Sequence, residues 1–272
     1  MALEIAISSF SFQYWPQSPQ VLKDICLTVP SGSICALLGP TNSGKSTLLQ
    51  AIAGILGTHH HESVANGHIR LGTEVFSPLP RKVMFPTVGL TLQDPRFQIS
   101  GLRESVLEEI ALTLQSFDYP EAEVDARTDQ MIERIGLSHL SHRRPSSLSG
   151  GELQRVALAN VLIAQPEILL LDEPCNSLDG VAQSRLGSLI RSIKGTTTVI
   201  LADYQIDFAL PLADHFVVLN EGTVVFAGDR AGLINRFSEF RNLLPTEHWE
   251  EVRRSLAASS KGTRIMKKCG VT

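Results

Sequence analysis

The chain has 272 residues, of which 43% are hydrophobic and 19% charged, and its formal net charge at pH 7 is -4. This length fits a single α/β domain, the composition is typical of a soluble protein, and the weak acidity argues against a protein that binds polyanions. The domain is predicted over residues 1–240. Residues 241–272 contain seven Lys/Arg and three Glu, so they are expected to form a basic, partly disordered C-terminal tail.

No segment is predicted to cross or enter a membrane. The longest apolar runs, residues 34–38 and 168–171, are far shorter than the roughly 18–20 residues of a spanning helix. The N-terminus shows no basic segment followed by an apolar core, which favours a cytoplasmic protein. No C-x-x-C spacing occurs among the four cysteines, so reduced thiols are expected at Cys26, Cys35, Cys175 and Cys269.

The first part of the chain predicts strands that lead into a loop and a helix. Residues 3–12 and 21–29 are short β-like stretches, and a Pro-Ser-Gly turn precedes the apolar run 34–38. That run predicts a buried strand. Helical apolar spacing follows Lys45 and closes at Gly54 to Gly57.

Residues 95–164 predict an inserted helical subdomain, because 102–114 and 124–135 show helical periodicity with charged outer faces. Strands and helices then alternate, which predicts βαβ units and a mainly parallel sheet. The predicted strands are 168–171, 197–201 and 216–219, the helices are 181–193 and one around 208–212, and residues 217–227 form a terminal hairpin.

The segment 39–47, Gly-Pro-Thr-Asn-Ser-Gly-Lys-Ser-Thr, is a P-loop between the predicted strand and helix. Its glycines let the backbone turn tightly so that successive N–H groups face a phosphate. Lys45 is expected to reach the β- and γ-phosphates of ATP, and the Ser46 hydroxyl to hold Mg²⁺. The predicted nucleotide contacts are Gly39, Pro40, Thr41, Asn42, Ser43, Gly44, Lys45, Ser46 and Thr47.

Two acids end a second apolar strand, Ile-Leu-Leu-Leu-Asp-Glu over residues 168–173. In this position after a P-loop the pattern is typical of a Walker B motif. Asp172 is predicted to reach the metal shell, and Glu173 to polarise the water that attacks the γ-phosphate.

Residues 148–152, Leu-Ser-Gly-Gly-Glu, resemble the signature motif of ATP-binding cassette (ABC) ATPases. The resemblance covers about residues 3–237. It implies a P-loop fold of ABC type, with a mainly parallel sheet, an antiparallel β subdomain and the inserted helices. In that family two cassettes pair head to tail, so Ser149 and Gly151 would complete the ATP site of a second cassette, identical or different. A simple helix cap is the alternative interpretation of this segment.

Further positions match the family's motifs. Gln93 looks like the glutamine that contacts Mg²⁺ and the water, and Asp179 in Ser-Leu-Asp resembles the acid at the dimer interface. Tyr14 stands where the family places an aromatic residue on adenine. Phe12 or Trp15 could serve instead, and an aromatic at a strand end can equally be a packing residue.

One position departs from the pattern, because Tyr204 occupies the place of the family's switch histidine. A tyrosine hydroxyl can hydrogen-bond a phosphate, but with an ordinary pKa near ~10 it is a poor proton carrier at neutral pH. A cassette that hydrolyses ATP is favoured because Glu173 is present. A binding-only, regulatory half of a heterodimer is the alternative.

The segment Gln-Asp-Pro-Arg-Phe-Gln, residues 93–98, is similar to one typical of energy-coupling factor importers of vitamins, cobalt and nickel. There it lies beside the groove that receives a transmembrane scaffold. The resemblance implies a scaffold and a membrane substrate-binding component as partners, and no nucleic acid. A non-transport ABC ATPase acting on nucleic acid or ribosomes remains an alternative. A small-molecule kinase would lack the motif at 148–152.

Overall fold

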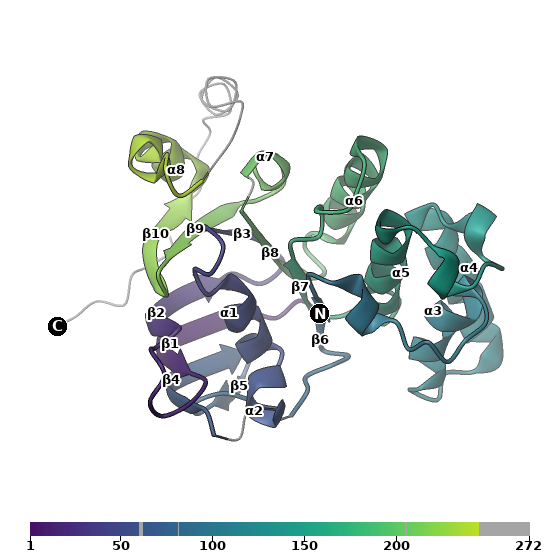
Figure 1. The fold of residues 1–272 in the computed structure, drawn as a ribbon, viewed down its shortest axis with the longest axis horizontal. Helices are drawn as coiled ribbons and strands as arrows, with labels where there is room; N and C mark the ends of the chain where they lie inside the picture. Colours follow the sequence, from purple (N-terminus) through teal and green to yellow (C-terminus); the bar gives the residue numbers. More distant parts are fainter. Residues whose placement is uncertain (60–61, 81, 205, 245–272) are drawn as a thin grey trace.

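The computed structural model describes residues 1–59, 62–80, 82–204 and 206–244. The chain forms two β-sheets and a group of helices set to one side of them (Figure 1). This arrangement confirms the predicted fold class, an α/β protein with a mainly parallel sheet, an antiparallel β part and inserted helices.

The smaller sheet is antiparallel and has the strand order β2-β1-β4-β5. Its strands alternate between buried and more exposed side chains, as expected for a sheet with one face on the core. The register of β1 shifts against both neighbours after Ile7 or Ser8. The strands are β1 (Ile5–Gln13), β2 (Leu22–Val29), β4 (Val64–Leu71) and β5 (Glu74–Phe76).

The larger sheet has the order β10-β9-β3-β8-β7-β6. Five of these strands are parallel, and β10 pairs antiparallel with β9 as the predicted hairpin. The strands at its centre are buried on both faces, which explains their continuous apolar sequences. They are β3 (Ile34–Leu38), β6 (Val88–Thr91), β7 (Ile168–Asp172), β8 (Thr198–Asp203), β9 (His215–Asn220) and β10 (Thr223–Asp229).

The helices cover both faces of the larger sheet. Alternate residues of β3 show the division: Cys35 and Leu37 join a core with α1 and the antiparallel sheet, whereas Ala36 and Leu38 join a core on the other face. Full burial raises the pKa of Cys35 to about 12. The helices that follow the sheet strands are α1 (Lys45–Ile52), α2 (Ile55–His59), α6 (Gly180–Ile193), α7 (Ile206–Ala209), α8 (Arg230–Asn235) and the 3-10 helix η4 (Phe237–Phe240).

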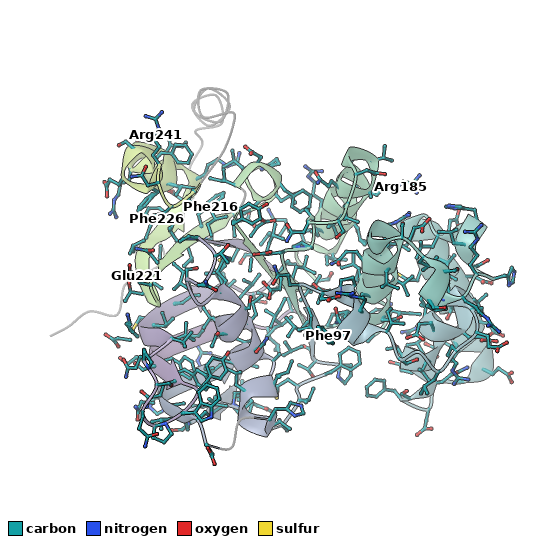
Figure 2. The ribbon with its side chains drawn as sticks, viewed as in Figure 1. Phe97, Arg185, Phe216, Glu221, Phe226 and Arg241 are labelled. Atoms are coloured by element: carbon teal, nitrogen blue, oxygen red, sulfur yellow. The ribbon has the colours of Figure 1, made fainter. Side chains whose placement is uncertain are left out.

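Phe216 and Phe226 on the β9–β10 hairpin lie beside α8 (Figure 2). Both side chains are buried in the core that also holds Leu233 of α8, and the ring centroids of Phe226 and Phe240 are 5.7 Å apart. The end of the described chain therefore packs on the sheet.

The inserted helices form a bundle beside the sheets (Figure 1). Ser105 begins the first long helix by accepting a hydrogen bond from the Glu108 N–H, and Gly136 ends the second in a left-handed conformation. The elements are η1 (Pro95–Gln98), α3 (Val106–Gln115), α4 (Glu121–Ile135), η2 (Ser138–Leu140), η3 (Pro145–Ser147) and α5 (Gly150–Leu162).

Several local predictions differ from the structure. After Gly54 the chain re-enters a short helix, α2, and the helix expected around 208–212 instead ends at Ala209. Strands β4, β5 and β6 were not predicted. Within the described residues no helix combines the length and apolarity needed to cross a membrane. Most of the predicted basic tail, including Cys269, lies outside the described residues.

Candidate nucleotide site

Three neighbouring parallel strands, β3, β8 and β7, deliver the polar residues of the candidate site to one edge of the sheet. Leu38 at the end of β3 pairs with Asp203 of β8, and Ala202 pairs with Asp172 of β7. The P-loop follows β3 directly. Because parallel strands end at the same edge, the segments 39–47 and 172–173 lie together although they are far apart in sequence.

The P-loop backbone takes conformations that only its glycines can adopt without strain. Gly39 has φ +152° and Gly44 has φ +104°. A Cβ atom on Gly39 would lie 2.1 Å from the carbonyl oxygen of Leu219, and one on Gly44 would lie 2.8 Å from the Leu22 side chain. Both positions therefore require glycine, and the tight turn that they permit is the kind of backbone that can direct N–H groups toward a ligand.

Lys45 is 5% exposed and lies back across this loop. Its Nζ donates to the carbonyl oxygens of Gly39 at 2.8 Å and Pro40 at 3.0 Å. Burial lowers the pKa of Lys45, and the negative charges of Glu173, Asp172 and Asp203 oppose this effect in that order. The ammonium group is thus embedded among three carboxylates, where added phosphate charge would stabilise it.

Asp172 is 3% exposed, and burial raises its pKa, while a hydrogen bond from Ser46 acts in the opposite direction. Two buried oxygen atoms here have no hydrogen-bond partner among the described residues, Oδ1 of Asp172 and Oγ of Ser43. The unpaired Asp172 oxygen and the neighbouring Ser46 hydroxyl suit a hard divalent cation such as Mg²⁺. The Ser43 hydroxyl can donate a hydrogen bond to a phosphate.

Glu173 is 8% exposed and has φ +47°, an uncommon backbone conformation for a glutamate. Its N–H donates to the carbonyl of Ala202 at 2.9 Å. The Gln93 side chain donates from Nε2 to Oε2 of Glu173 at 2.7 Å. Gln93 follows β6 and Glu173 follows β7, so two predicted catalytic residues meet through neighbouring strands.

Two polar residues near this edge were missed in the sequence. Asn176 donates from Nδ2 to Oε2 of Glu173 at 2.6 Å. Asp203 ends β8 and is 2% exposed. An acid at the end of a buried apolar strand, the same signal that marks Asp172, could have identified Asp203. Tyr204 comes next in the chain and is half-buried.

The predicted signature residues begin helix α5 in the helical bundle, away from α1 (Figure 1). Ser149 precedes the helix, and its N–H and hydroxyl both donate to Glu152 Oε2 at 2.7 Å. A Cβ atom on Gly151 would lie 2.4 Å from the Ser177 carbonyl oxygen. Asp179 is exposed and caps α6 by accepting from the Ala182 N–H at 2.8 Å.

Tyr14 lies next to the P-loop helix. Its hydroxyl is 3.1 Å from Oγ1 of Thr47, and its ring meets Phe12 edge to face at a centroid distance of 5.0 Å. Phe12 is 1% exposed and belongs to the core, whereas Trp15 is 56% exposed. The structure therefore leaves Tyr14 and Trp15 as the aromatic residues that a base could reach.

Comparison with known proteins identifies the family, because the model of the family described as ABC transporter matches residues 22–176. The chain belongs to the ABC transporter ATPase family. Members of this family bind ATP, normally with Mg²⁺, and hydrolyse it, so this chain is an ATP-binding ATPase subunit.

Relatives of this ABC ATPase are named as ATP-binding proteins of transporters, and some of them as import proteins. The energy-coupling factor transporter ATP-binding protein EcfA2 of Latilactobacillus sakei is 36% identical over 83% of the chain and 78% of its own length. The nickel import ATP-binding protein NikO of Rhodobacter capsulatus is 35% identical over 90% and 96%. Among solved structures, cbiO1 of Clostridium perfringens, part of the complex cbiONQ, matches with a TM-score of 0.71 at 26% identity over 94% and 100%.

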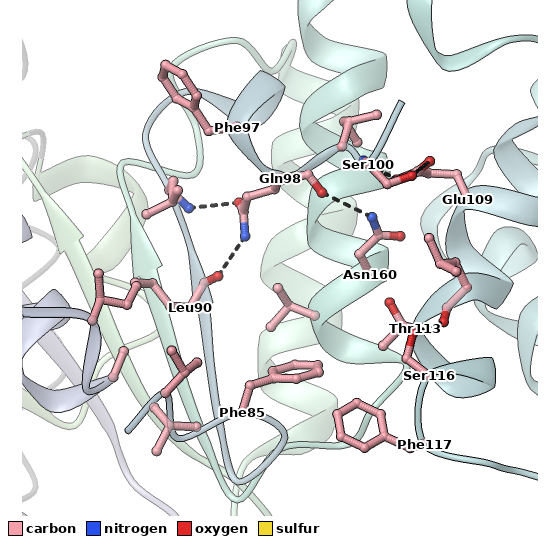
Figure 3. Close-up of a pocket in the computed structure, with 18 residues that line it drawn as sticks. Phe85, Leu90, Phe97, Gln98, Ser100, Glu109, Thr113, Ser116, Phe117 and Asn160 are labelled. Atoms are coloured by element: carbon pink, nitrogen blue, oxygen red, sulfur yellow. Dashed lines mark hydrogen bonds between the residues drawn. The ribbon is translucent and has the colours of Figure 1, made fainter. Parts of the chain in front are cut away.

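This ABC ATPase also has an apolar groove of about 530 Å³ between β6 and the helical bundle (Figure 3). The side chain of Gln98 fixes one wall by accepting from the Leu92 N–H at 2.8 Å and donating to the Leu90 carbonyl at 2.7 Å. Phe97 at the rim is 80% exposed. The lining includes Ile55, Val83, Phe85, Leu90, Leu92, Phe97, Ile99, Leu112 and Phe117.

Proposed function

We propose that this chain binds and hydrolyses ATP to energise import of a micronutrient, a vitamin or a transition-metal ion, through a transmembrane scaffold. It would work peripherally at the cytoplasmic face of the membrane. The convergence of Lys45, Asp172 and Glu173 at one sheet edge carries the proposal. The names of the relatives, which include energy-coupling factor and nickel import ATPases, support the substrate class.

In the proposed site, the N–H groups of the loop 39–47 and the Lys45 ammonium hold the β- and γ-phosphates. Ser46, Asp172 and Gln93 would hold Mg²⁺, which supplies charge neutralisation on the phosphates. Glu173 accepts a proton from the attacking water or orients it. Tyr14 stacks on the base, and its hydroxyl contact with Thr47 supports that placement because it holds the ring near the P-loop.

ATPase rates of the full-length chain test the hydrolytic part of the proposal. Lys45→Ala and Glu173→Gln are expected to lower kcat by about 10²-fold or more, since removal of a general base typically costs 10²–10⁴. Glu173→Gln should keep its affinity for ATP, whereas Lys45→Ala should lose much of it. A Glu173→Gln variant that turns over ATP at the wild-type rate would refute the role given to Glu173.

Tyr204 supports the second candidate function, a binding-only regulatory cassette of a heterodimer. A tyrosine is in general a poorer proton carrier near neutral pH than the histidine that the family places here. The two functions are separated by Tyr204→His in the assembled complex. A gain in kcat of tenfold or more, from a very low wild-type rate, favours the regulatory cassette. An unchanged rate with robust wild-type turnover favours the hydrolysing one.

The groove beside Gln98 is the proposed docking site for the transmembrane scaffold. Its apolar lining suits an amphipathic helix, which would lay apolar side chains against Phe85, Leu90 and Phe117. Because Gln93 and Gln98 lie on one short segment, a shift of the docked helix would reach Glu173 through Gln93.

The exposed side chain of Phe97 offers a test of this docking. Phe97→Asp should release the chain from isolated membranes while its ATP affinity stays unchanged. Val75→Asp, an exposed apolar position on the antiparallel sheet, serves as the matched control and should stay bound. Equal retention of both variants would rule out the groove as the docking site.

A further inference from the structure

A single oxygen of the Glu173 carboxylate receives two side-chain hydrogen bonds. Oε2 accepts from Gln93 Nε2 at 2.7 Å and from Asn176 Nδ2 at 2.6 Å. Both are amide donors to a carboxylate, a type of bond that is shorter and stronger than one between neutral groups. The hydrogen bonds that the described residues donate to this carboxylate end on Oε2, which leaves Oε1 for a water molecule.

The two donors come from different loops. Gln93 lies in the segment that leads from β6 to the apolar groove, whereas Asn176 lies in the turn that joins β7 to α6. That turn continues into Ser177, whose carbonyl lies against Gly151, and into Asp179. The Glu173 carboxylate is therefore the point at which the groove segment and the loop beside the signature motif meet.

The backbone at Glu173 also depends on its surroundings. A non-glycine residue with φ +47° is disfavoured and persists where neighbouring contacts hold it. The bond from the Glu173 N–H to Ala202 holds its main chain, and the bond from Asn176 holds its side chain. Without the Asn176 amide, the carboxylate would keep the hydrogen bond from Gln93 alone and could turn about it to other rotamers.

We propose that Asn176 is a positioning residue for Glu173. Its amide keeps Oε2 occupied and turns Oε1 toward the water that attacks the γ-phosphate, and it ties this orientation to the loop 177–179. The inference rests on the proposed hydrolytic function, in which Glu173 acts on that water. Asn176 itself touches no phosphate in this role, so it acts on the rate of the chemical step and not on nucleotide affinity.

The test measures kcat, KM and ATP affinity for the full-length chain in the complex in which it is isolated from membranes. Asn176→Ala and the isosteric Asn176→Asp should lower kcat at least tenfold and leave KM and the Kd for ATP within twofold. The aspartate should give the larger loss, because it replaces a donor by a second negative charge. Asn235→Ala, an exposed asparagine on α8, should leave kcat unchanged.

The Asn176→Ala change, made in the Glu173→Gln variant, distinguishes positioning of Glu173 by Asn176 from a general structural role of Asn176. Combined with Glu173→Gln, the Asn176→Ala change should have no further effect on the residual rate, since the carboxylate that it positions is gone. An equal fall in both backgrounds would overturn the inference, as would wild-type kcat in both Asn176 variants. If wild-type protein and Glu173→Gln turn over ATP equally, the proposed function fails instead, whatever Asn176 does.

Discussion

Asp172 combines a carboxylate charge with nearly complete burial. Burial raises the pKa of its carboxyl above the ordinary value. A group with a raised folded-state pKa favours folding when protonated, and that stability is lost as pH rises through the raised pKa. At neutral pH and without Mg²⁺, the Asp172 charge therefore destabilises the fold.

Asp172→Asn removes this charge at nearly constant shape. In EDTA at pH 7.5 we expect the variant's free energy of unfolding to exceed the wild-type value by on the order of 1 kcal/mol. The difference should close as pH falls toward the ordinary carboxyl pKa, ~4. Urea denaturation at several pH values measures it. Asp125→Asn on the exposed side of α4 is the control, and a difference that did not depend on pH would contradict the argument.

Tyr14 carries a second prediction at this scale. Tyr14→Ala should weaken ATP binding by roughly 1–3 kcal/mol, the usual worth of a base stacked on an aromatic ring, whereas Tyr14→Phe loses only the contact with Thr47. Calorimetry with ATP gives the affinities, and Trp15→Ala is the comparison. A larger loss for Trp15→Ala than for Tyr14→Ala would move the stacking role to Trp15.

At the scale of elements, the start of helix α5 has two adjacent glycines, Gly150 and Gly151, and only Gly151 has no room for a larger side chain. A Cβ atom on Gly151 would lie 2.4 Å from the Ser177 carbonyl oxygen, but the atoms nearest to one on Gly150 are 3.9 Å away. Gly151→Ala should therefore destabilise the chain by roughly 1–3 kcal/mol, and Gly150→Ala should change its stability by less than 1 kcal/mol. Thermal unfolding without nucleotide compares the pair. Equal melting temperatures would show that the loop 177–179 can move away at little cost.

The sequence predicted best those elements whose burial is complete. Strands β3 and β7 are continuous apolar runs because both their faces are covered. Strand β4 was missed because Asn66, Gly67 and His68 interrupt its pattern, and its pairing with β1, far away in sequence, is what makes it a strand. Helix α7 ends at Ala209, because Pro211 disfavours a helical conformation at Leu210.

In the candidate site, likewise, some residues could be predicted from the sequence and some contacts could not. The P-loop, Asp172 and Glu173 could be proposed from sequence, because their motifs are contiguous and follow predicted strands. The bonds of Glu173 to Gln93 and Asn176 could not be, because one spans 80 residues and the other depends on the backbone angle at Glu173. The clustering of Asp203 with Lys45 likewise depends on strand order.

At the scale of the whole molecule, the P-loop and the signature motif belong to separate parts. Helix α5 lies in the bundle to one side of the sheets, and α1 lies against them (Figure 1). Ser149 is exposed, whereas Gly151 is half-buried against the Ser177 carbonyl. An exposed Ser149 away from α1 is the arrangement expected of a motif that serves a second cassette. Pairing of two cassettes around ATP is therefore the proposed working assembly.

Sedimentation of the full-length chain tests this pairing. Glu173→Gln with ATP and Mg²⁺ should sediment as a dimer, alone or with the second cassette of its complex, because bound nucleotide is not consumed. Lys45→Ala should remain monomeric under the same conditions, since phosphate is the shared ligand of the two halves. Failure of Glu173→Gln to pair in both mixtures would refute the assembly.

Asp179→Ala should weaken the dimer without lowering the ATP affinity of the monomer.

The position of Lys45 has a consequence for turnover. Its ammonium group already satisfies two carbonyl oxygens, so a nucleotide that engages it must take the place of contacts that the loop provides for itself. The phosphates of ATP or ADP then compete with the Gly39 and Pro40 carbonyl oxygens for the Lys45 ammonium group. Each hydrogen bond that the nucleotide replaces reduces the affinity gained from the new contact. The loop reforms its own contacts as product leaves, which suits a cassette that must release what it has split before the next cycle can begin.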